Sequence, residues 1–103
     1  MSDQSPFPRR LKAARTAKGF SQQGLGLRLG MDDNTASARM NQYERGKHTP
    51  DYQTLKRMAD ELGVPVSYFF CEDELSAELT HLFGRLTDGQ KRTVIAVIKE
   101  MAK

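Results

Sequence analysis

The sequence predicts an all-α protein made of short helices with sharp ends. Apolar residues recur three and four positions apart along most of the chain, which is the spacing of one helix face, and no segment has the alternation of a β-strand. Gly19, Gly30, Gly46 and Gly63 each follow one of these segments, and glycine commonly ends a helix. At Cys71 the composition changes to acidic and leucine-rich sequence. The chain is therefore expected to contain a domain at residues 8–70 and a helical element at residues 71–103.

Length and composition indicate one small domain whose basic charge is unevenly distributed. The chain has 103 residues, the usual size of one domain. Its single cysteine excludes an internal disulfide, and it has neither a signal-like apolar start nor 18 consecutive apolar residues, so we expect a soluble, cytoplasmic protein outside the membrane. Residues 1–70 contain 11 basic and 7 acidic residues, whereas residues 71–103 contain 5 and 6. The basic excess favours nucleic acid as a partner, although a merely soluble surface would give similar totals.

The first two helices are predicted from their end signals. Residues 1–7 are expected to form a flexible tail. Pro8 suits the first position of a helix over residues 9–18, because its missing N–H would have no partner there. Ser21 follows an apolar residue and is a good N-cap for a second helix over residues 22–29. Gly26 lies inside that helix, where the absence of a side chain can allow a neighbouring helix to approach closely.

The third helix, expected over residues 34–45, has one apolar and one polar face. Asp32 and Asp33 are candidate N-caps for it. Its apolar face contains Ala36, Met40 and Tyr43, and its polar face contains Asn34, Ala38, Asn41, Gln42 and Arg45. Amides pair with adenine, arginine pairs with guanine and a methyl group can contact thymine, so the polar face could read DNA bases. Taken alone, however, this helix favours an ordinary solvated face.

The rest of the chain completes the core and adds a second apolar surface. Asp51 can cap a fourth helix over residues 52–62, and the apolar residues 64–70 form a short helix that closes the core. After Cys71 we expect a two-helix hairpin that is too small to be stable by itself. Its apolar stripes must pack on the same chain, on a second copy or on another protein. The residues expected at a dimer interface are Leu75, Leu79, Leu82, Phe83, Leu86, Val94, Val97, Ile98 and Met101.

The order of these signals resembles the Cro/repressor-type helix-turn-helix family, also called XRE. The resemblance covers about residues 8–70 and is carried by Arg15, Gly19-Phe20-Ser21-Gln22, Leu25, Leu29-Gly30, Tyr43-Glu44-Arg45-Gly46-Lys47, Pro50 and Leu55 through Leu62-Gly63-Val64. It implies a five-helix, lambda-repressor-like domain. In such a domain the third helix enters the major groove of double-stranded DNA, and the start of the second helix crosses the DNA backbone.

The resemblance also implies roles for individual residues. Base contacts are implied for Ser37, Ala38, Arg39, Asn41 and Gln42, and backbone contacts for Gln22, Gln23, Arg45, Lys47 and Thr49. Arg15 and Glu44 are implied to form a buried, structural ion pair, and no cofactor or metal is implied. The sequence departs from the family between Gly30 and Glu44, where several extra residues fall in MDDNTASAR. These residues form either a longer loop or an extra turn of the third helix.

The leading hypothesis is a sequence-specific transcriptional regulator that represses from a palindromic operator as a homodimer. The C-terminal hairpin resembles the dimerisation helices of some family members, and a two-fold dimer would place two third helices about one DNA turn, roughly 34 Å, apart. The alternative is an antitoxin-like protein whose hairpin binds a partner protein and whose DNA binding serves autoregulation.

An enzyme is disfavoured by the spacing of the reactive residues. His48, His81 and Cys71 lack metal-ligand spacing, and the glycines follow no phosphate-binding motif. His48 is instead expected to be a loop residue near a DNA phosphate. No effector domain is visible in the sequence either. Any regulation is therefore expected through dimerisation, a partner or turnover.

Overall fold

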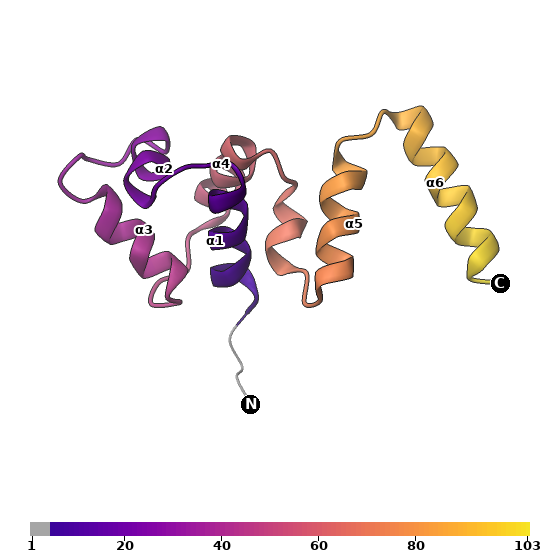
Figure 1. The fold of residues 1–103 in the computed structure, drawn as a ribbon, viewed down its shortest axis with the longest axis horizontal. Coiled ribbons are helices and arrows are strands. Elements are labelled where there is room, and N and C mark those ends of the chain that lie inside the picture. Colours follow the sequence, from indigo (N-terminus) through magenta and orange to yellow (C-terminus); the bar gives the residue numbers. More distant parts are fainter. Residues whose placement is uncertain (1–4) are drawn as a thin grey trace.

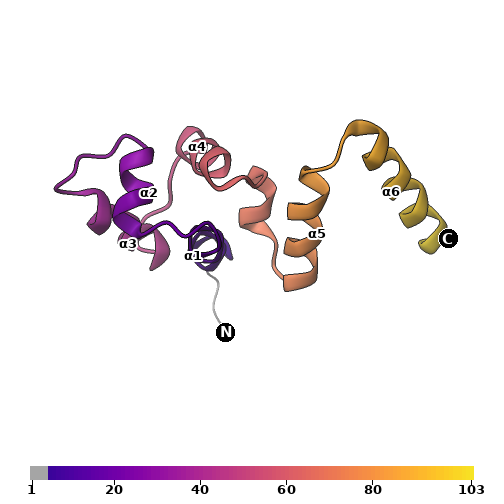
Figure 2. The same cartoon turned by 45° about the horizontal axis from the view of Figure 1, so that its top comes forward.

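The computed structural model describes residues 5–103 and contains helices and no strand over that range (Figure 1). The elements are α1 (Phe7–Ala17), α2 (Gln22–Arg28), α3 (Ala36–Glu44), α4 (Tyr52–Leu62), the 3-10 helix η1 (Val66–Phe70), α5 (Glu74–Gly84) and α6 (Asp88–Met101). The molecule is elongated, with extents of 52 × 34 × 22 Å. Figures 1 and 2 show α2 and α3 at one end and α6 at the other. The predicted all-α fold is confirmed.

One hydrophobic core contains residues of the four helices α1, α2, α3 and α4 and of η1. Its buried members are Phe7, Leu11, Ala14, Leu25, Leu29, Met40, Leu55, Met58, Ala59, Leu62 and Phe69. Met40 comes from the predicted apolar face of α3, and Phe69 comes from the short helix that was expected to close the core. The core therefore holds the first five helical segments as one unit and fixes which face of α3 remains outside.

The flexible tail predicted over residues 1–7 wrongly includes Phe7. Residues 1–4 lie outside the described range, but Phe7 is the first residue of α1 and is only 3% exposed. Its ring packs edge to face on Phe69, with the ring centroids 5.3 Å apart. Phe7 lies one helical turn before the fully buried Leu11, so the same face of α1 continues into the core.

The prediction that Asp32 and Asp33 cap the third helix is wrong. The helix begins at Ala36, and Thr35 precedes it without a side-chain cap. The main-chain oxygen of Asp32 accepts hydrogen bonds from the N–H groups of Thr35 and Ala36, at 3.0 and 2.9 Å. The Asp33 carboxylate instead accepts a hydrogen bond from the side-chain amide of Gln23, at 2.8 Å. The extra residues therefore lengthen the loop between α2 and α3, and α3 gains no additional turn.

Gly26 brings α2 and α3 into close contact, as predicted. A Cβ atom built on Gly26 would lie 2.7 Å from the Cβ of Ala36 and 3.0 Å from its main-chain oxygen. Ala36 is fully buried at this point. Because neither residue has a larger side chain, the two helices cross at a distance that an ordinary side chain would prevent.

Several helix ends follow the predicted signals. Ser21 Oγ accepts a hydrogen bond from the N–H of Gly24 at 2.8 Å, and the Asp51 carboxylate accepts one from the N–H of Thr54 at 2.9 Å. Hydrogen bonds from the side chain and the N–H of Thr54 hold the pKa of Asp51 below its ordinary value. Gly63 ends α4 with a φ of +70°, a conformation that residues with a side chain rarely adopt.

Two arginines near the start of α1 attach α5 to the core. Arg10 is 2% exposed; its Nε donates to the main-chain oxygen of Cys71 at 2.9 Å, and its Nη1 binds the Glu74 carboxylate at 2.9 Å. Arg9 donates to the main-chain oxygen of Glu72 at 2.5 Å. On the other side of this junction Ala77 is buried, and α5 packs on η1. These contacts join α5 to the domain that was predicted to end at residue 70.

The last helix lies apart from the core. Figures 1 and 2 show α6 running back from the end of α5 and diverging from it, so that the predicted hairpin is open. Leu86 lies in the turn between the two helices, and no residue of α6 is buried. Both C-terminal helices therefore leave apolar side chains in solvent.

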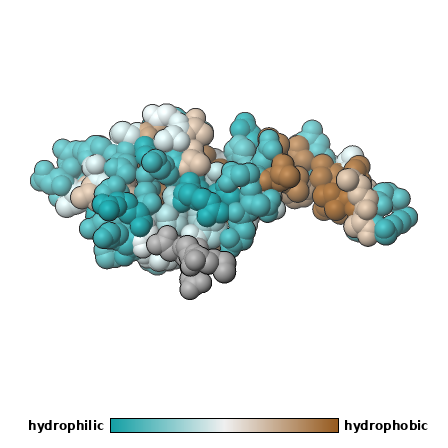
Figure 3. Space-filling model, turned by 60° about the horizontal axis from the view of Figure 1, so that its bottom comes forward, coloured by the Kyte–Doolittle hydropathy of each residue, from teal (hydrophilic) through white to brown (hydrophobic). Residues whose placement is uncertain are grey.

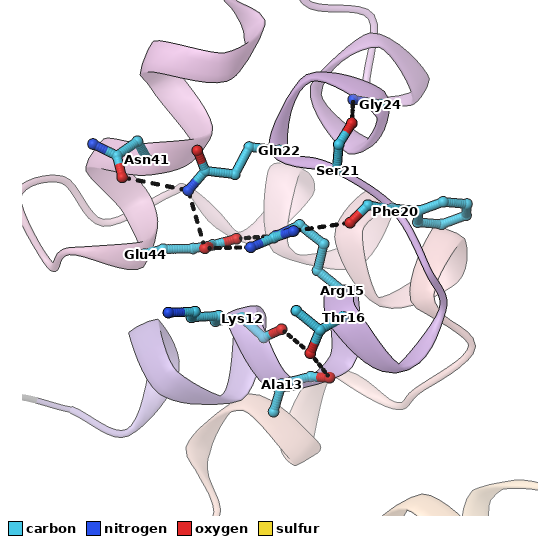
Figure 4. Close-up of polar contacts among 10 residues, drawn as sticks. All are labelled: Lys12, Ala13, Arg15, Thr16, Phe20, Ser21, Gln22, Gly24, Asn41 and Glu44. Carbon is cyan, nitrogen blue, oxygen red and sulfur yellow. Dashed lines mark hydrogen bonds and ion pairs between the residues drawn. The ribbon is translucent and has the colours of Figure 1, made fainter.

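A buried ion pair joins α1 to the end of α3, as the family resemblance implied (Figure 4). Arg15 Nε and Nη2 donate to the two carboxylate oxygens of Glu44, at 2.6 and 3.0 Å. The remaining Nη1 donates to the main-chain oxygen of Phe20 at 2.8 Å. The side chains are only 11% and 4% exposed, so the pair is largely shielded from water. It fixes the C-terminal end of α3 on α1 and on the loop that leads to α2.

Removing the buried carboxylate should destabilise the domain strongly. We expect Glu44→Ala to lower the free energy of unfolding by about 3–5 kcal/mol, because it leaves the Arg15 guanidinium buried without its counter-charge. Glu61→Ala provides the control, since Glu61 pairs with Arg28 at 3.5 Å across a largely exposed surface. Its cost should be below about 1 kcal/mol. Urea unfolding measures both, and equal losses would contradict a special role for the buried pair.

The contact at Gly26 should make a helix-favouring substitution harmful. Gly26→Ala replaces glycine by a better helix former, yet we expect a loss of about 1–3 kcal/mol in stability because the new methyl group overlaps Ala36. Gly89→Ala in α6 is the matched control, since the nearest atom to its added methyl group is Thr87 Oγ1 at 4.0 Å. Thermal unfolding should show a lower midpoint for the first variant and an unchanged or higher one for the second. A stabilised Gly26→Ala protein would rule out the overlap.

Candidate nucleic-acid interface

The exposed face of α3 contains most of the predicted base-contacting residues. Ser37, Ala38, Arg39 and Gln42 are all exposed, whereas Ala36 and Met40 on the opposite side are buried. At 100° per residue Ala38 and Gln42 lie on neighbouring turns of the same face. The structure therefore brings these four predicted residues together on one polar surface, which lies at the end of the molecule away from α6 (Figure 1).

Asn41 and Gln22 are partly engaged inside the protein. The side-chain nitrogen of Gln22 donates to Asn41 Oδ1 at 3.3 Å and to Glu44 Oε1 at 3.2 Å. Figure 4 shows the amide nitrogen of Asn41 and the amide oxygen of Gln22 pointing away from Glu44. Asn41 can therefore still donate to a base, but the donor group of the Gln22 side chain is already used. This interaction couples the start of α2 to the ion pair that holds α3.

Gln23 acts on the lengthened loop. Its side-chain nitrogen donates to the Asp33 carboxylate at 2.8 Å and to the Asp33 main-chain oxygen at 3.1 Å. The hydrogen bonds fasten the loop to α2 and hold the Asp33 carboxylate against the protein. Because the side-chain nitrogen of Gln23 binds Asp33, the predicted contact of Gln23 with the DNA backbone would have to use its main-chain N–H.

The segment after α3 presents basic and hydroxyl groups beside the polar face. Arg45, Lys47 and Thr49 are exposed, as expected for residues that contact a DNA backbone. The N–H of Lys47 donates to the main-chain oxygen of Gln42 at 2.9 Å, and Gly46 has a φ of +74°. This tight turn ends the helix and keeps the three side chains close to its C-terminal end.

An open hollow next to this turn brings Tyr43 and His48 beside the predicted DNA-contacting residues. Its volume is about 330 Å³, and it is lined by Arg39, Gln42, Tyr43, His48 and Thr49. Sequence reasoning placed Tyr43 on the apolar face of α3 and His48 in a loop near phosphate. Neither position shows by itself that the turn folds back beside Gln42. The signal that could have located them is the glycine at position 46, which reverses the chain.

The described residues offer no competing site of the kinds that the sequence raised. Over residues 5–103, no three His, Cys, Asp or Glu side chains come together as metal ligands would. Within the same range, no helix is both long enough and apolar enough to cross a membrane. Cys71 is a half-buried free thiol at the junction before α5.

Comparisons with known proteins identify the family. Residues 11–69 match the family model described as helix-turn-helix. Over 62 residues the chain is 39% identical to an uncharacterized HTH-type transcriptional regulator, YonR, derived from the SPbeta prophage of Bacillus subtilis (strain 168). That match covers 60% of this chain and 54% of the relative, so the chain spans about half the length of this curated protein.

A solved structure extends the similarity to the C-terminal helices. The crystal structure of the transcriptional regulator BswR matches with a TM-score of 0.84 and 42% sequence identity. The match covers 91% of this chain and 93% of that one. The family model lies over α1 to η1, which include the exposed face of α3 and the buried Arg15–Glu44 pair. The chain therefore belongs to the helix-turn-helix family of DNA-binding transcriptional regulators, as its sequence predicted.

Proposed function

We propose that this chain is a repressor that binds a palindromic DNA operator as a homodimer. The observation that carries the proposal is the division of α3 into a face locked in the core and a face of exposed polar groups. Arg15 and Glu44 hold the end of the helix, and Gly26 sets its distance from α2. A rigidly positioned helix of this kind can present its side chains to the base edges in the major groove.

The exposed face has the chemistry that base recognition requires. Gln42 can pair bidentately with adenine, Arg39 can pair with guanine, and the methyl group of Ala38 can contact the methyl group of thymine. Ser37 and the free amide nitrogen of Asn41 add hydrogen-bonding groups on the same side. These five residues are therefore proposed to set the sequence preference.

The neighbouring groups suit the DNA backbone. Arg45 and Lys47 bring positive charge, and Thr49 brings a hydroxyl group, to the turn beside α3. Contacts of this type position a protein on DNA and contribute affinity without reading the sequence. Because the side-chain donors of Gln22 and Gln23 bind protein groups, their proposed backbone contacts pass through their main-chain N–H groups.

Dimerisation is proposed through the apolar surface of α5 and α6. Leu75 and Met101 are 78% and 80% exposed, and Figure 3 shows hydrophobic residues gathered over the C-terminal helices. Leu79, Leu82, Val97 and Ile98 are also exposed, whereas Phe83, Leu86 and Val94 are half-buried. Ile95, which the sequence places on the same apolar stripe of the last helix, is also exposed on this surface. Monomers rarely expose so many neighbouring large apolar side chains, which favours a protein partner for this surface.

The charges on the two helices favour a second copy as the partner. Glu72, Asp73, Glu74 and Glu78 make the start of α5 acidic, whereas α6 carries Lys91, Arg92 and Lys99 against Asp88 and Glu100 and has a small basic excess. In a two-fold dimer, α6 of each copy would pack on α5 of the other. The basic residues of α6 would then lie beside the acidic residues of α5, around an apolar centre. Such a dimer would also place two α3 helices on successive turns of one DNA face, as a palindromic operator requires.

The roles of Gln42 and Lys47 can be separated by selecting bound duplexes from a random pool. We expect Gln42→Ala to relax the preference at one base position in each half-site, at a cost of about 1–3 kcal/mol. Lys47→Ala should instead weaken binding to all sequences and reduce the salt dependence of the affinity. Identical selected sequences and identical salt dependence for the two variants would refute the assignment.

The dimer interface can be tested without removing a folded segment. We expect Val97→Glu to convert the protein into a monomer and to weaken operator binding by at least about tenfold, because the new charge would be buried in the apolar interface. Thr93→Glu adds the same charge at an exposed polar position of α6 and should leave both properties unchanged. Light scattering and operator titration measure the two effects. A wild-type protein that remains monomeric at operator-binding concentrations would overturn the dimer and favour a partner of different sequence.

A further inference from the structure

We propose that Gln22 is a positioning residue that fixes the side-chain amide of Asn41 with its nitrogen toward DNA, and that Asn41 therefore reads guanine. Gln22 is the first residue of α2 and Asn41 lies on α3, so the contact joins the two helices of the motif. Both residues are half-buried. The inference rests on the proposed function, because it adds a base preference to the face of α3 that is proposed to read DNA.

A series of hydrogen bonds leads from the buried ion pair to Asn41 (Figure 4). Arg15 donates to both carboxylate oxygens of Glu44, at 2.6 and 3.0 Å. The side-chain nitrogen of Gln22 donates to Glu44 Oε1 at 3.2 Å and to Asn41 Oδ1 at 3.3 Å. Each member of the series therefore restricts the orientation of the next.

The chemistry of the groups allows each amide only one orientation. A carboxylate that is paired with a guanidinium only accepts hydrogen bonds, so the Gln22 atom that faces Glu44 must be the nitrogen. An amide nitrogen only donates, so the Asn41 atom that faces Gln22 must be the oxygen. The Asn41 nitrogen is the atom that remains for DNA, and Figure 4 shows it pointing away from Glu44. Turning this amide over would place two donors against each other.

The main chain on both sides of the series is already fixed. Ser21 caps the start of α2, directly before Gln22. The contact of Gly26 with Ala36 sets the distance between α2 and α3. Gln22 therefore spans two helices that do not move apart, and the Asn41 amide is ordered before DNA arrives. A group that is ordered in advance loses less conformational entropy on binding.

A side chain that presents only a donor distinguishes guanine from adenine. In the major groove guanine offers two adjacent acceptors, N7 and O6, whereas adenine offers the N7 acceptor beside the N6 amino donor. An unrestrained asparagine pairs with adenine because it offers its oxygen and its nitrogen together. The oxygen of Asn41 is bound by Gln22, so the adenine amino group would find no acceptor on it. Either acceptor of guanine can bind the exposed amide nitrogen.

Base selection from a random duplex pool tests the preference. The position that loses its preference in Asn41→Ala is the one that Asn41 reads, and we expect a guanine–cytosine pair there in the wild type. Gln22→Met keeps the length of the side chain but cannot donate to Asn41, so the released amide should accept adenine. The enrichment of adenine at this position should rise about three- to tenfold, the value of one hydrogen bond.

Gln23→Met is the matched control for this variant. The side chain of Gln23 binds Asp33 and not Asn41, so its loss should leave the guanine preference unchanged. Asn41→Asp tests the polarity directly, because both of its side-chain oxygens accept hydrogen bonds. One oxygen can bind Gln22 while the other faces DNA, and the preferred base should change from guanine to cytosine, which presents an amino donor. An adenine–thymine pair in the wild type, or unchanged selection by Gln22→Met, would overturn the proposal.

The orientation of Asn41 can also be measured without DNA. In the full-length, ¹⁵N-labelled protein, Gln22→Met should shift the side-chain amide resonances of Asn41, whereas Gln23→Met should not. Circular dichroism checks that both variants remain folded. Unshifted Asn41 resonances in Gln22→Met would refute the positioning role whether or not the protein binds DNA. Shifted resonances in a protein that selects no DNA sequence would refute the proposed function and the guanine preference, and would leave the positioning of Asn41 intact.

Discussion

The buried pair of Arg15 and Glu44 is the interaction on which the placement of α3 depends. Arg15 satisfies its donors with the carboxylate of α3 and the main-chain oxygen that precedes α2. Glu44 in turn accepts from Gln22 at the start of α2. The ends of α1, α2 and α3 are therefore all in contact with the same buried ion pair. A buried ion pair contributes little net stability. Any arrangement that separates the two groups, however, leaves a buried charge without its partner, and this cost keeps α3 in one position.

The sequence predicted the features that depend on neighbouring residues. Ser21 and Asp51 cap their helices, Gly63 ends α4, and the apolar positions of α3 face the core, because each depends on local geometry or helical period. The family resemblance supplied the Arg15–Glu44 pair, which joins residues 29 positions apart. It also identified the surface that contains Gln42, although the partial engagement of Asn41 and Gln22 needed the three-dimensional contacts.

The errors arose where a distant contact overruled a local preference. Asp32 and Asp33 are good caps in isolation, but the close contact of Gly26 with Ala36 belongs to the crossing of α2 and α3, and α3 starts at Ala36. Phe7 looks like part of a polar tail until Phe69, 62 positions later, provides its partner. Arg10 was not singled out because its partners are 61 and 64 residues away. These contacts of Arg10 hold one side of α5 against the core, while its other side remains exposed to solvent.

In this domain, different contacts hold the long loop between α2 and α3 and the position of α3 itself. The additional residues are held by Gln23 through Asp33, while the helix crossing is held by Gly26 and the end of α3 by Glu44. The turn from which the motif takes its name therefore does not determine the helix angle here. We therefore expect that the length of this turn can change, in a related chain or in an engineered variant, without moving the exposed face of α3 relative to the core. Searches that require a fixed spacing between the two helices would overlook such proteins.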